Sequence, residues 1–248
     1  MIDRDELEDW ARRFGVSSTQ IHRDHLISHL LAALGQLHPT ARFFGGTALG
    51  RTHLSASRLS EDIDLLHPDP RDFLSVLRAE LPRALRREFP ETSSTEPFPD
   101  GDGLASMLGP PGITPIKLYV GRDGSNTTPW EFSPTNVELR YRDLPTHTTL
   151  ECPTLVTFAA MKLAAWSDRH APRDLFDLAG LARLEVLTEP AVERIYRAKM
   201  GTGIVTGEFE RLPAHTAGAW ETELGAQVGD LPAASVCLEH VRAALRAR

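Results

Sequence analysis

Cysteine is scarce in this sequence, which contains only Cys152 and Cys237 among its 248 residues. The two lie far apart and show neither the dense spacing of a disulfide framework nor the paired spacing of a cysteine-based zinc site. Both kinds of site are therefore excluded. Two isolated thiols are typical of buried or half-buried side chains in a reducing compartment.

Long apolar runs are also missing. The longest nearly apolar stretch, residues 155–166, has 12 residues and contains Lys162, whereas a membrane-spanning helix needs about 20 apolar residues. The first ten residues, MIDRDELEDW, are charged from the third position onward, unlike a signal peptide. We therefore expect a cytoplasmic protein with no membrane partner.

Positive charge is in deficit, because 27 Lys and Arg face 34 Asp and Glu and the net charge is −7. This balance excludes a protein that coats nucleic acid through a broad basic surface, but not a small basic site. Basic residues gather locally at 78–87, at Arg140 and Arg142, and at 162–173. If RNA binds, we expect it along one of these three patches.

The elements that are present divide the chain into two parts. Periodic apolar residues predict helices at 3–14, 17–34, 47–51, 72–87, 154–167, 173–182, 191–200 and 234–246. Strands are predicted at 41–44, 61–66, 113–120 and 136–141, a long loop or irregular strands at 91–112, and a polar turn at 121–128. Gly35 is the predicted stop of the second helix, and Pro82 is predicted to kink or split the helix at 72–87. The predicted fold class is α+β (mixed α/β), with a mixed sheet core in residues 1–151 and a helical region in residues 152–248.

Asp62 and Asp64 are the first residues with a clear chemical meaning. They lie two apart on a predicted strand, so both carboxylates project from one face while Ile63 and Leu65 project from the other. Two close carboxylates repel each other unless a cation lies between them, and oxygen ligands favour Mg²⁺ or Mn²⁺ over zinc. A solvated strand edge is the plain alternative.

Gly45, Gly46 and Thr47 stand between a predicted strand and a short predicted helix. Paired glycines let the backbone approach a ligand closely, and N–H groups at a helix start attract phosphate. A tight turn is the plain alternative. The order of glycine loop, short helix and strand with two aspartates is more specific, because it sets a phosphate cradle beside a divalent-metal site. Nucleotidyl transfer requires that pairing.

The apolar helix predicted to begin the C-terminal region carries Lys162. A partly buried lysine needs a partner, which a bound anion can supply, whereas a lysine that extends to solvent needs none. Asp174 and Asp177 are three residues apart on the next predicted helix and are therefore neighbours. For Asp174, an ion pair with Arg169 or Arg173 is the plain alternative.

Three histidines, His22, His25 and His29, follow one another at helical spacing in the second predicted helix. Imidazole is a common metal ligand. The sequence shows no carboxylate or cysteine cluster beside them, so the pattern does not favour a metal site.

Three segments read together resemble a known family: GGTAL at 45–49, RLSEDIDL at 58–65 and KLAAWSDRHAPRDLFDLAGL at 162–181. They resemble the AbiEii/AbiGii-type nucleotidyltransferase toxins, including the MenT-type toxins, of the polymerase-β-like nucleotidyltransferase superfamily. The resemblance implies catalytic roles for Asp62, Asp64, Lys162 and Asp177, with Asp62 and Asp64 as metal ligands. It implies nucleotide binding by Gly45, Gly46, Thr47, Arg58, Ser60, Lys162 and Arg173. Pairing with a carboxylate is an equal alternative for Arg58.

The implied reaction transfers a nucleotide from an NTP, with Mg²⁺ or Mn²⁺, to an RNA acceptor such as the 3′ end of tRNA. The implied outcome is growth arrest, restrained by a cognate antitoxin protein. A small-molecule nucleotidyltransferase of the aminoglycoside type and a non-catalytic binding module with the same fold are the alternatives.

The sequence departs from the pattern of the superfamily at one place. Lys117 and Tyr119 stand where a third carboxylate is expected, and Glu138 is a candidate replacement. Ser60 suggests a regulatory hypothesis, because a phosphate two residues before Asp62 would compete with the metal and the triphosphate.

Overall fold

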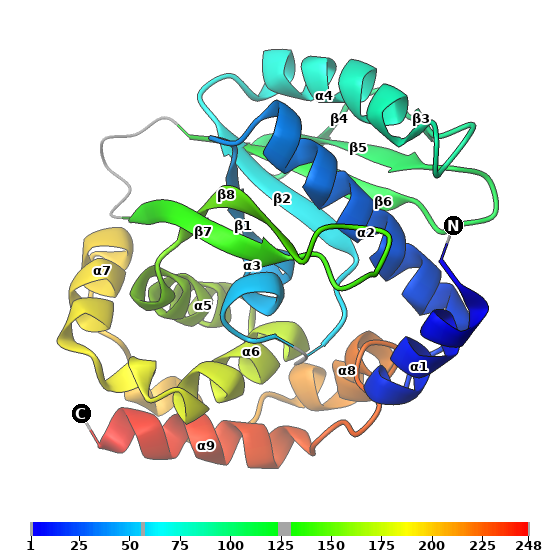
Figure 1. The fold of residues 1–248 in the computed structure, drawn as a ribbon. Coiled ribbons are helices and arrows are strands. Elements are labelled where there is room, and N and C mark those ends of the chain that lie inside the picture. Colours follow the sequence, from blue (N-terminus) through cyan, green and yellow to red (C-terminus); the bar gives the residue numbers. More distant parts are fainter. Residues whose placement is uncertain (1, 56–57, 124–129, 248) are drawn as a thin grey trace. The chain divides into compact units, whose positions relative to one another are not determined.

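The computed structural model describes residues 2–55, 58–123 and 130–247, and the chain forms two compact units (Figure 1). Unit 1 consists of Met1–Ser125 and Ser133–Cys152, and unit 2 consists of Asn126–Phe132 and Pro153–Arg248. Unit 1 contains a mixed sheet with helices, while unit 2 is helical. The predicted α+β class is confirmed.

The sheet of unit 1 has the strand order β3-β5-β6-β2-β1-β8-β7, and β4 pairs with β5 outside this path. Its strands are β1 (Arg42–Phe44), β2 (Asp62–His67), β3 (Ser93–Ser94), β4 (Phe98–Asp100), β5 (Gly103–Gly109), β6 (Ile116–Arg122), β7 (Phe132–Glu138) and β8 (His147–Pro153). Strand β2 runs parallel to β6 and antiparallel to β1, while β1 runs parallel to β8. The centre of the sheet therefore joins residues from distant parts of the sequence.

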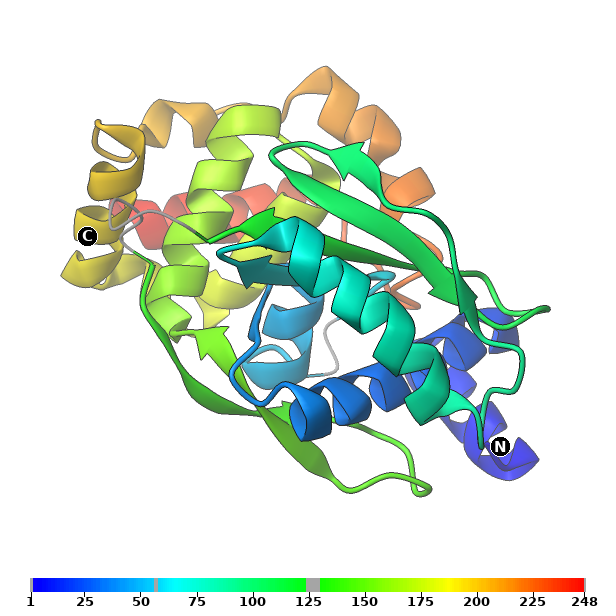
Figure 2. The ribbon, with the colours of Figure 1, turned by 90° about the horizontal axis from the view of Figure 1, so that it is seen from above.

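The helices of unit 1 are α1 (Arg4–Phe14), α2 (Ser18–Leu37), α3 (Gly45–Thr52) and α4 (Pro70–Leu85). Helices α2 and α4 lie side by side (Figures 1 and 2), α4 also packs on β5 and β6, and α3 packs on β1 and β2. Local capping sets several helix ends. The Ser17 side chain accepts a hydrogen bond from the Gln20 N–H, and Asp69 accepts one from the Asp72 N–H.

Several local expectations differ from the structure. Helix α2 continues past Gly35, where a Cβ would lie 1.8 Å from Oγ1 of Thr148 on β8, so this glycine permits a close contact instead of a stop. Pro82 lies inside α4, because buried leucines on both sides hold the helix in place (Leu77, Leu81 and Leu85). For residues 91–112, where a loop and irregular strands were the two alternatives, the structure shows the strands β3, β4 and β5. The predicted turn at 121–128 begins within β6, and its residues 124–128 lie outside the described residues.

Unit 2 is built around α6. Its elements are α5 (Leu155–Arg169), α6 (Pro172–Arg183), α7 (Pro190–Met200), α8 (Ala214–Leu224), α9 (Ala234–Arg246) and the short 3₁₀ helices η1 (Val186–Thr188) and η2 (Thr206–Phe209). Helix α6 packs on α5, α8 and α9. Trp166 is fully buried and stacks on Phe209. In the part of the chain that the structure describes, no helix has the length and apolar character to cross a membrane.

Candidate active site

Strand β2 presents two carboxylates on one face. Ile63 and Leu65 are fully buried, while Asp62 and Asp64, at the alternating positions, are partly exposed. This is the two-residue periodicity predicted from the sequence. We call Asp62 and Asp64 the strand pair.

The glycine loop lies directly against the strand pair. Gly45 has a φ of 78°, and a Cβ at this position would lie 2.2 Å from Oδ2 of Asp64. A side chain is therefore excluded both by the backbone conformation and by the carboxylate. The hydroxyl of Thr47 donates a hydrogen bond to the backbone carbonyl of Asp62. The start of α3 and the acidic strand are thus locked together within unit 1.

Strand β6 supplies the neighbours of the strand pair. In the parallel register of β2 and β6, Lys117 pairs with Asp62 and Tyr119 pairs with Asp64. Nζ of Lys117 donates to Oδ2 of Asp100 at 3.1 Å, and the Tyr119 hydroxyl donates to Oδ1 of Asp102 at 2.6 Å. Asp100 ends β4 and Asp102 lies in the turn between β4 and β5, and neither was among the residues predicted from the sequence. The turn sequence PDGDG at 99–103 was the available signal.

The charge of this region is unbalanced. Burial lowers the pKa of Lys117, but the hydrogen bond with Asp100 and the charges of Asp62, Asp100 and Asp64 outweigh that effect and raise it. Lys117 therefore stays protonated. Asp62 and Asp64 offer carboxylate oxygens, the ligand type that suits Mg²⁺ or Mn²⁺ better than zinc.

Glu138 does not join the strand pair. It ends β7, and both β8 and β1 lie between β7 and β2 in the sheet. Neighbouring strands are about 4.8 Å apart, so its carboxylate is too remote to serve as a third ligand there. It lies 3.5 Å from Nε of Arg140 instead.

Arg58 and Ser60 are both buried in the segment that leads into β2. Nη1 of Arg58 lies 3.4 Å from the carbonyl oxygen of Leu59 and 3.5 Å from Oγ of Ser60. The Ser60 hydroxyl, for which the sequence suggested phosphorylation, thus lies beside the Arg58 guanidinium.

A buried ionic network holds α3 against the remainder of unit 1. Arg51 of α3 donates to Oδ1 of Asp24 at 2.9 Å, and Arg140 donates to the same atom at 3.1 Å. The Tyr141 hydroxyl donates to Oδ2 of Asp24 at 2.8 Å. Burial raises the pKa of Asp24, but the two arginines and the tyrosine together lower it below its usual value. Only 2% of the Arg140 side chain is exposed, so Arg140 cannot contribute to the basic surface patch predicted around it.

In unit 2, Lys162 is the centre of a second cluster. Its Nζ lies 3.0 Å from Oδ1 of Asp174 and 2.7 Å from Oδ2 of Asp177, and Nε of Arg169 lies 2.7 Å from Oδ2 of Asp174. The lysine thus has carboxylate partners within the chain, and Asp174 pairs with Arg169 as the plain alternative expected. We call Asp174 and Asp177 the helix pair. Arg173, on the same helix, is 43% exposed and lies 3.6 Å from Glu223.

Comparison with known proteins places the chain in a family. The family described as "Nucleotidyl transferase AbiEii toxin, Type IV TA system" matches residues 29–247. No curated protein sequence matches the chain. The solved structure of MenT4, a nucleotidyltransferase toxin from Mycobacterium tuberculosis H37Rv, aligns with a TM-score of 0.64 at 19% identity, over 99% of this chain and 89% of that chain.

A nucleotidyltransferase-like protein from Paracoccidioides brasiliensis aligns with a TM-score of 0.38 at 17% identity, over 66% of this chain and 77% of that chain, which is too low to support an argument. The agreement with MenT4 shows a shared fold. The family match covers most of both units and confirms the resemblance of the three sequence segments. The chain therefore belongs to the AbiEii family of nucleotidyltransferase toxins of type IV toxin–antitoxin systems, enzymes that use an NTP and whose action an antitoxin counteracts.

Proposed function

We propose that this toxin transfers a nucleotide from an NTP to the 3′ end of tRNA in a reaction that depends on Mg²⁺, with Mn²⁺ as a substitute. The observation that carries the proposal is the contact between Gly45 at the start of α3 and the strand pair. A phosphate cradle and a set of oxygen ligands meet there. The choice of tRNA rests on the resemblance to toxins with that target. The cytoplasm is the proposed compartment because it contains tRNA.

The proposed site residues of unit 1 have distinct roles in the reaction. The strand pair holds the divalent ion, and the backbone N–H groups at Gly46 and Thr47 bind the triphosphate. When bound, the ion neutralises charge on the phosphate oxygens and aligns the attacking group. The 3′ hydroxyl of the acceptor gives its proton to water and forms a bond to the α-phosphorus, while the bond from the α-phosphorus to the bridging oxygen of the β-phosphate breaks and pyrophosphate leaves. In the same proposal Arg58 and Ser60, in the segment before β2, also bind the nucleotide.

We propose that residues 152–248 complete the active site of the core formed by residues 1–151. In this proposal Lys162 and Arg173 contact the triphosphate, and Asp177 fixes the position of the Lys162 ammonium group. Support comes from the family match, which continues through unit 2, and from the ion pair of 2.7 Å between Lys162 and Asp177. Arg173 is exposed enough to exchange Glu223 for a phosphate.

The test is a transfer assay with labelled NTPs, Mg²⁺ and total tRNA. We expect label on tRNA with the native chain, loss of label when a chelator removes the metal, and loss of label in Asp62→Ala. Asp72→Ala, at an exposed acid in the first turn of α4, is the matched control and should keep full activity. Mapping of the labelled position then checks the 3′ end.

Three results would contradict the proposal in different ways. Label on a small-molecule acceptor alone would replace the RNA target but keep the chemistry. Transfer that persists in the chelated sample would remove the metal from the mechanism. Toxicity in cells that Asp62→Ala retains in full would show that the chain acts by binding and not by transfer.

A further inference from the structure

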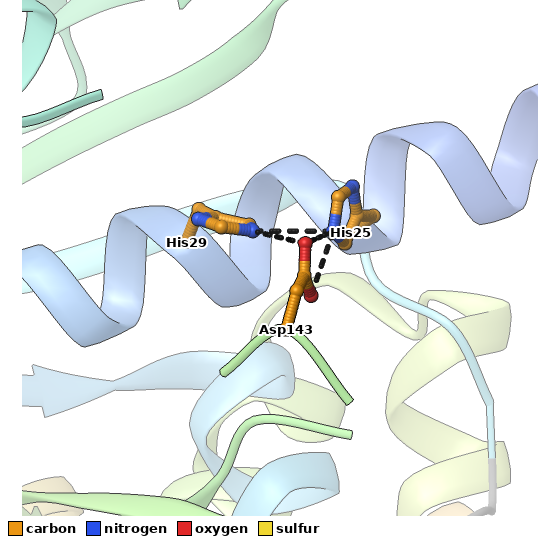
Figure 3. Close-up of side chains that lie close together, drawn as sticks. All are labelled: His25, His29 and Asp143. Atoms are coloured by element: carbon orange, nitrogen blue, oxygen red, sulfur yellow. Dashed lines mark hydrogen bonds and ion pairs between the residues drawn. The ribbon is translucent and has the colours of Figure 1, made fainter. Parts of the chain in front are cut away.

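A second group of metal-capable side chains lies in unit 1, formed by residues that the proposed mechanism does not use. His25 and His29 stand one turn apart on α2, and Asp143 reaches them from the loop between β7 and β8 (Figure 3). One ligand atom from each residue lies within 4.8 Å of the other two. Asp143 follows His29 by 114 positions, so no local pattern in the sequence indicates a carboxylate beside these histidines.

The three ligand atoms form a compact triangle. Nε2 of His25 lies 3.1 Å from Nε2 of His29 and 2.9 Å from Oδ2 of Asp143, and Nε2 of His29 lies 3.2 Å from the same Oδ2. Tetrahedral Zn²⁺ with bonds of about 2.0–2.1 Å separates neighbouring ligand atoms by about 3.3 Å. A small inward or outward adjustment of each side chain therefore suffices to seat the ion. Three protein ligands leave a fourth position for water.

Hydrogen bonding alone crowds the three atoms. A neutral imidazole carries one N–H, so two rings that both donate to Oδ2 of Asp143 through Nε2 bring two hydrogens close together between nitrogens only 3.1 Å apart. If one ring turns its lone pair inward, that lone pair faces the carboxylate oxygen. A cation in the triangle replaces the protons and gives each lone pair a partner.

The two rings are held in place by aromatic neighbours. The centroid of the His25 ring lies 4.8 Å from that of Tyr141 and 5.4 Å from that of Phe89, and His29 lies 5.2 Å from Phe89. Rings held in one orientation by their neighbours are typical of metal-binding histidines.

We propose that His25, His29 and Asp143 bind one transition-metal ion of the Zn²⁺ class, which fastens the β7–β8 loop to α2. Two nitrogen ligands with one carboxylate favour such an ion over Mg²⁺, so this site and the strand pair select different metals. The same loop carries Arg140 and Tyr141, which hold Asp24 and, through it, Arg51 of α3. The ion therefore stabilises the support of the glycine loop and takes no part in the transfer of the nucleotide.

The test uses the full chain without a histidine tag, stripped of metal by a chelator and titrated with Co²⁺ alone. The native chain should bind one Co²⁺ with the visible absorption of a tetrahedral site, and Zn²⁺ should displace it. Binding should weaken at least tenfold in His29→Ala and in Asp143→Asn. His22→Ala, on the same helix but outside the triangle, is the matched control and should bind as the native chain does.

Thermal unfolding gives an independent reading that does not require activity. Zn²⁺ should raise the Tm of the native chain, of His22→Ala and of Asp62→Ala, and should leave the Tm of Asp143→Asn unchanged. Asp143 lies on a partly exposed loop, so this variant is expected to fold. Absence of the Co²⁺ absorption, or equal affinity in the native chain, His29→Ala and Asp143→Asn, would overturn the proposal. A result of this kind leaves the transfer assay, and hence the proposed function, unaffected.

Discussion

The strand pair in unit 1 and the helix pair in unit 2 are two sets of aspartates in opposite electrostatic surroundings. The strand pair is partly exposed, and its β6 neighbours Lys117 and Tyr119 donate hydrogen bonds to Asp100 and Asp102. The negative charges of Asp62, Asp64 and Asp100 all act on Lys117. An acidic excess of this kind is costly until a cation from solution joins it. The surroundings of the strand pair therefore favour the cation binding that the proposed function assigns to it.

The helix pair is balanced by cations of the chain itself. Asp174 is 0% exposed and Asp177 is 2% exposed, and Lys162 lies within 3.0 Å of Asp174 and 2.7 Å of Asp177. Arg169 adds a second positive charge. Because two cations face two carboxylates, this cluster needs no metal to be stable. Similar residues therefore have different electrostatic surroundings in the two units, which agrees with the proposed metal-binding role of the strand pair and a structural or positioning role of the helix pair.

The largest effect is predicted for the removal of one of the two proposed metal ligands. Asp62→Ala should reduce nucleotide transfer by at least about a thousandfold, because metal assistance supplies several kcal/mol at about 1.4 kcal/mol per tenfold in rate. The Tm should stay the same or rise, since the substitution relieves repulsion between carboxylates. Transfer assays and thermal unfolding of the same preparation measure both. A large loss of Tm in Asp62→Ala would make the strand pair structural and erase the contrast between the pairs.

Lys162→Met tests the other side of the comparison. Removal of one partner from a buried ionic cluster costs about 3–5 kcal/mol in unfolding free energy, and the Lys162 side chain is only 9% exposed. Urea unfolding should show this loss. Arg173→Met, at an exposed position, is the control and should change stability little. If Lys162→Met abolished transfer with unchanged stability, Lys162 would serve the nucleotide alone.

The contrast between the pairs was only partly predictable from the sequence. Alternation of apolar residues placed Asp62 and Asp64 on one face of a strand, because that pattern is local. The position of Lys117 opposite Asp62 depends on the register between two strands that are distant in sequence. No local pattern specifies that register. The partners Asp100 and Asp102 come from a hairpin within a stretch predicted to be a loop or irregular strands.

Other elements escaped prediction for similar physical reasons. Strand β8, with the sequence HTTLECP, is polar at alternate positions and short of apolar residues, so its place between β1 and β7 comes from pairing in the sheet. Helix α8 contains few large apolar residues and relies on buried Trp220 and Leu224. By contrast, α9 was predicted with correct bounds, because its apolar residues recur at helical spacing.

Gly45→Ala is the next prediction in size, and Gly101→Ala is its matched control. Both glycines have positive φ, but a Cβ at Gly101 would meet nothing within 4 Å. Gly101→Ala should therefore lose only about 1–2 kcal/mol for the left-handed conformation. Gly45→Ala must also displace the Asp64 carboxylate, so it should lose more stability and most of its activity. Equal losses in both variants would show that the glycine loop does not set the geometry of the strand pair.

The pH dependence of stability offers a smaller test of the helix pair. Burial raises the pKa of Asp174, but Lys162 and Arg169 outweigh it, and the net direction in the folded chain is downward. A lowered folded pKa gives stability that is present above the unfolded value of about 3.9 and is lost as the pH falls further. Below about pH 4, the native chain should lose unfolding free energy more steeply than Asp174→Asn. Parallel urea curves for the two chains would contradict the assignment.

Lys117→Met is the prediction with the smallest expected effect. It removes the lysine that lies beside the strand pair. Its side chain is 34% exposed, so solvent screens part of its charge and the effect should be modest. Loss of a cation beside the strand pair strengthens the pull of the carboxylates on Mg²⁺. The Mg²⁺ concentration for half-maximal transfer should therefore fall by about two- to fivefold. Arg122→Met, farther along the same strand, is the control and should leave it unchanged. A higher Mg²⁺ requirement in Lys117→Met would mean that the Lys117 ammonium group binds the triphosphate. In that case unit 1, like unit 2, would contribute a cationic side chain to the reaction.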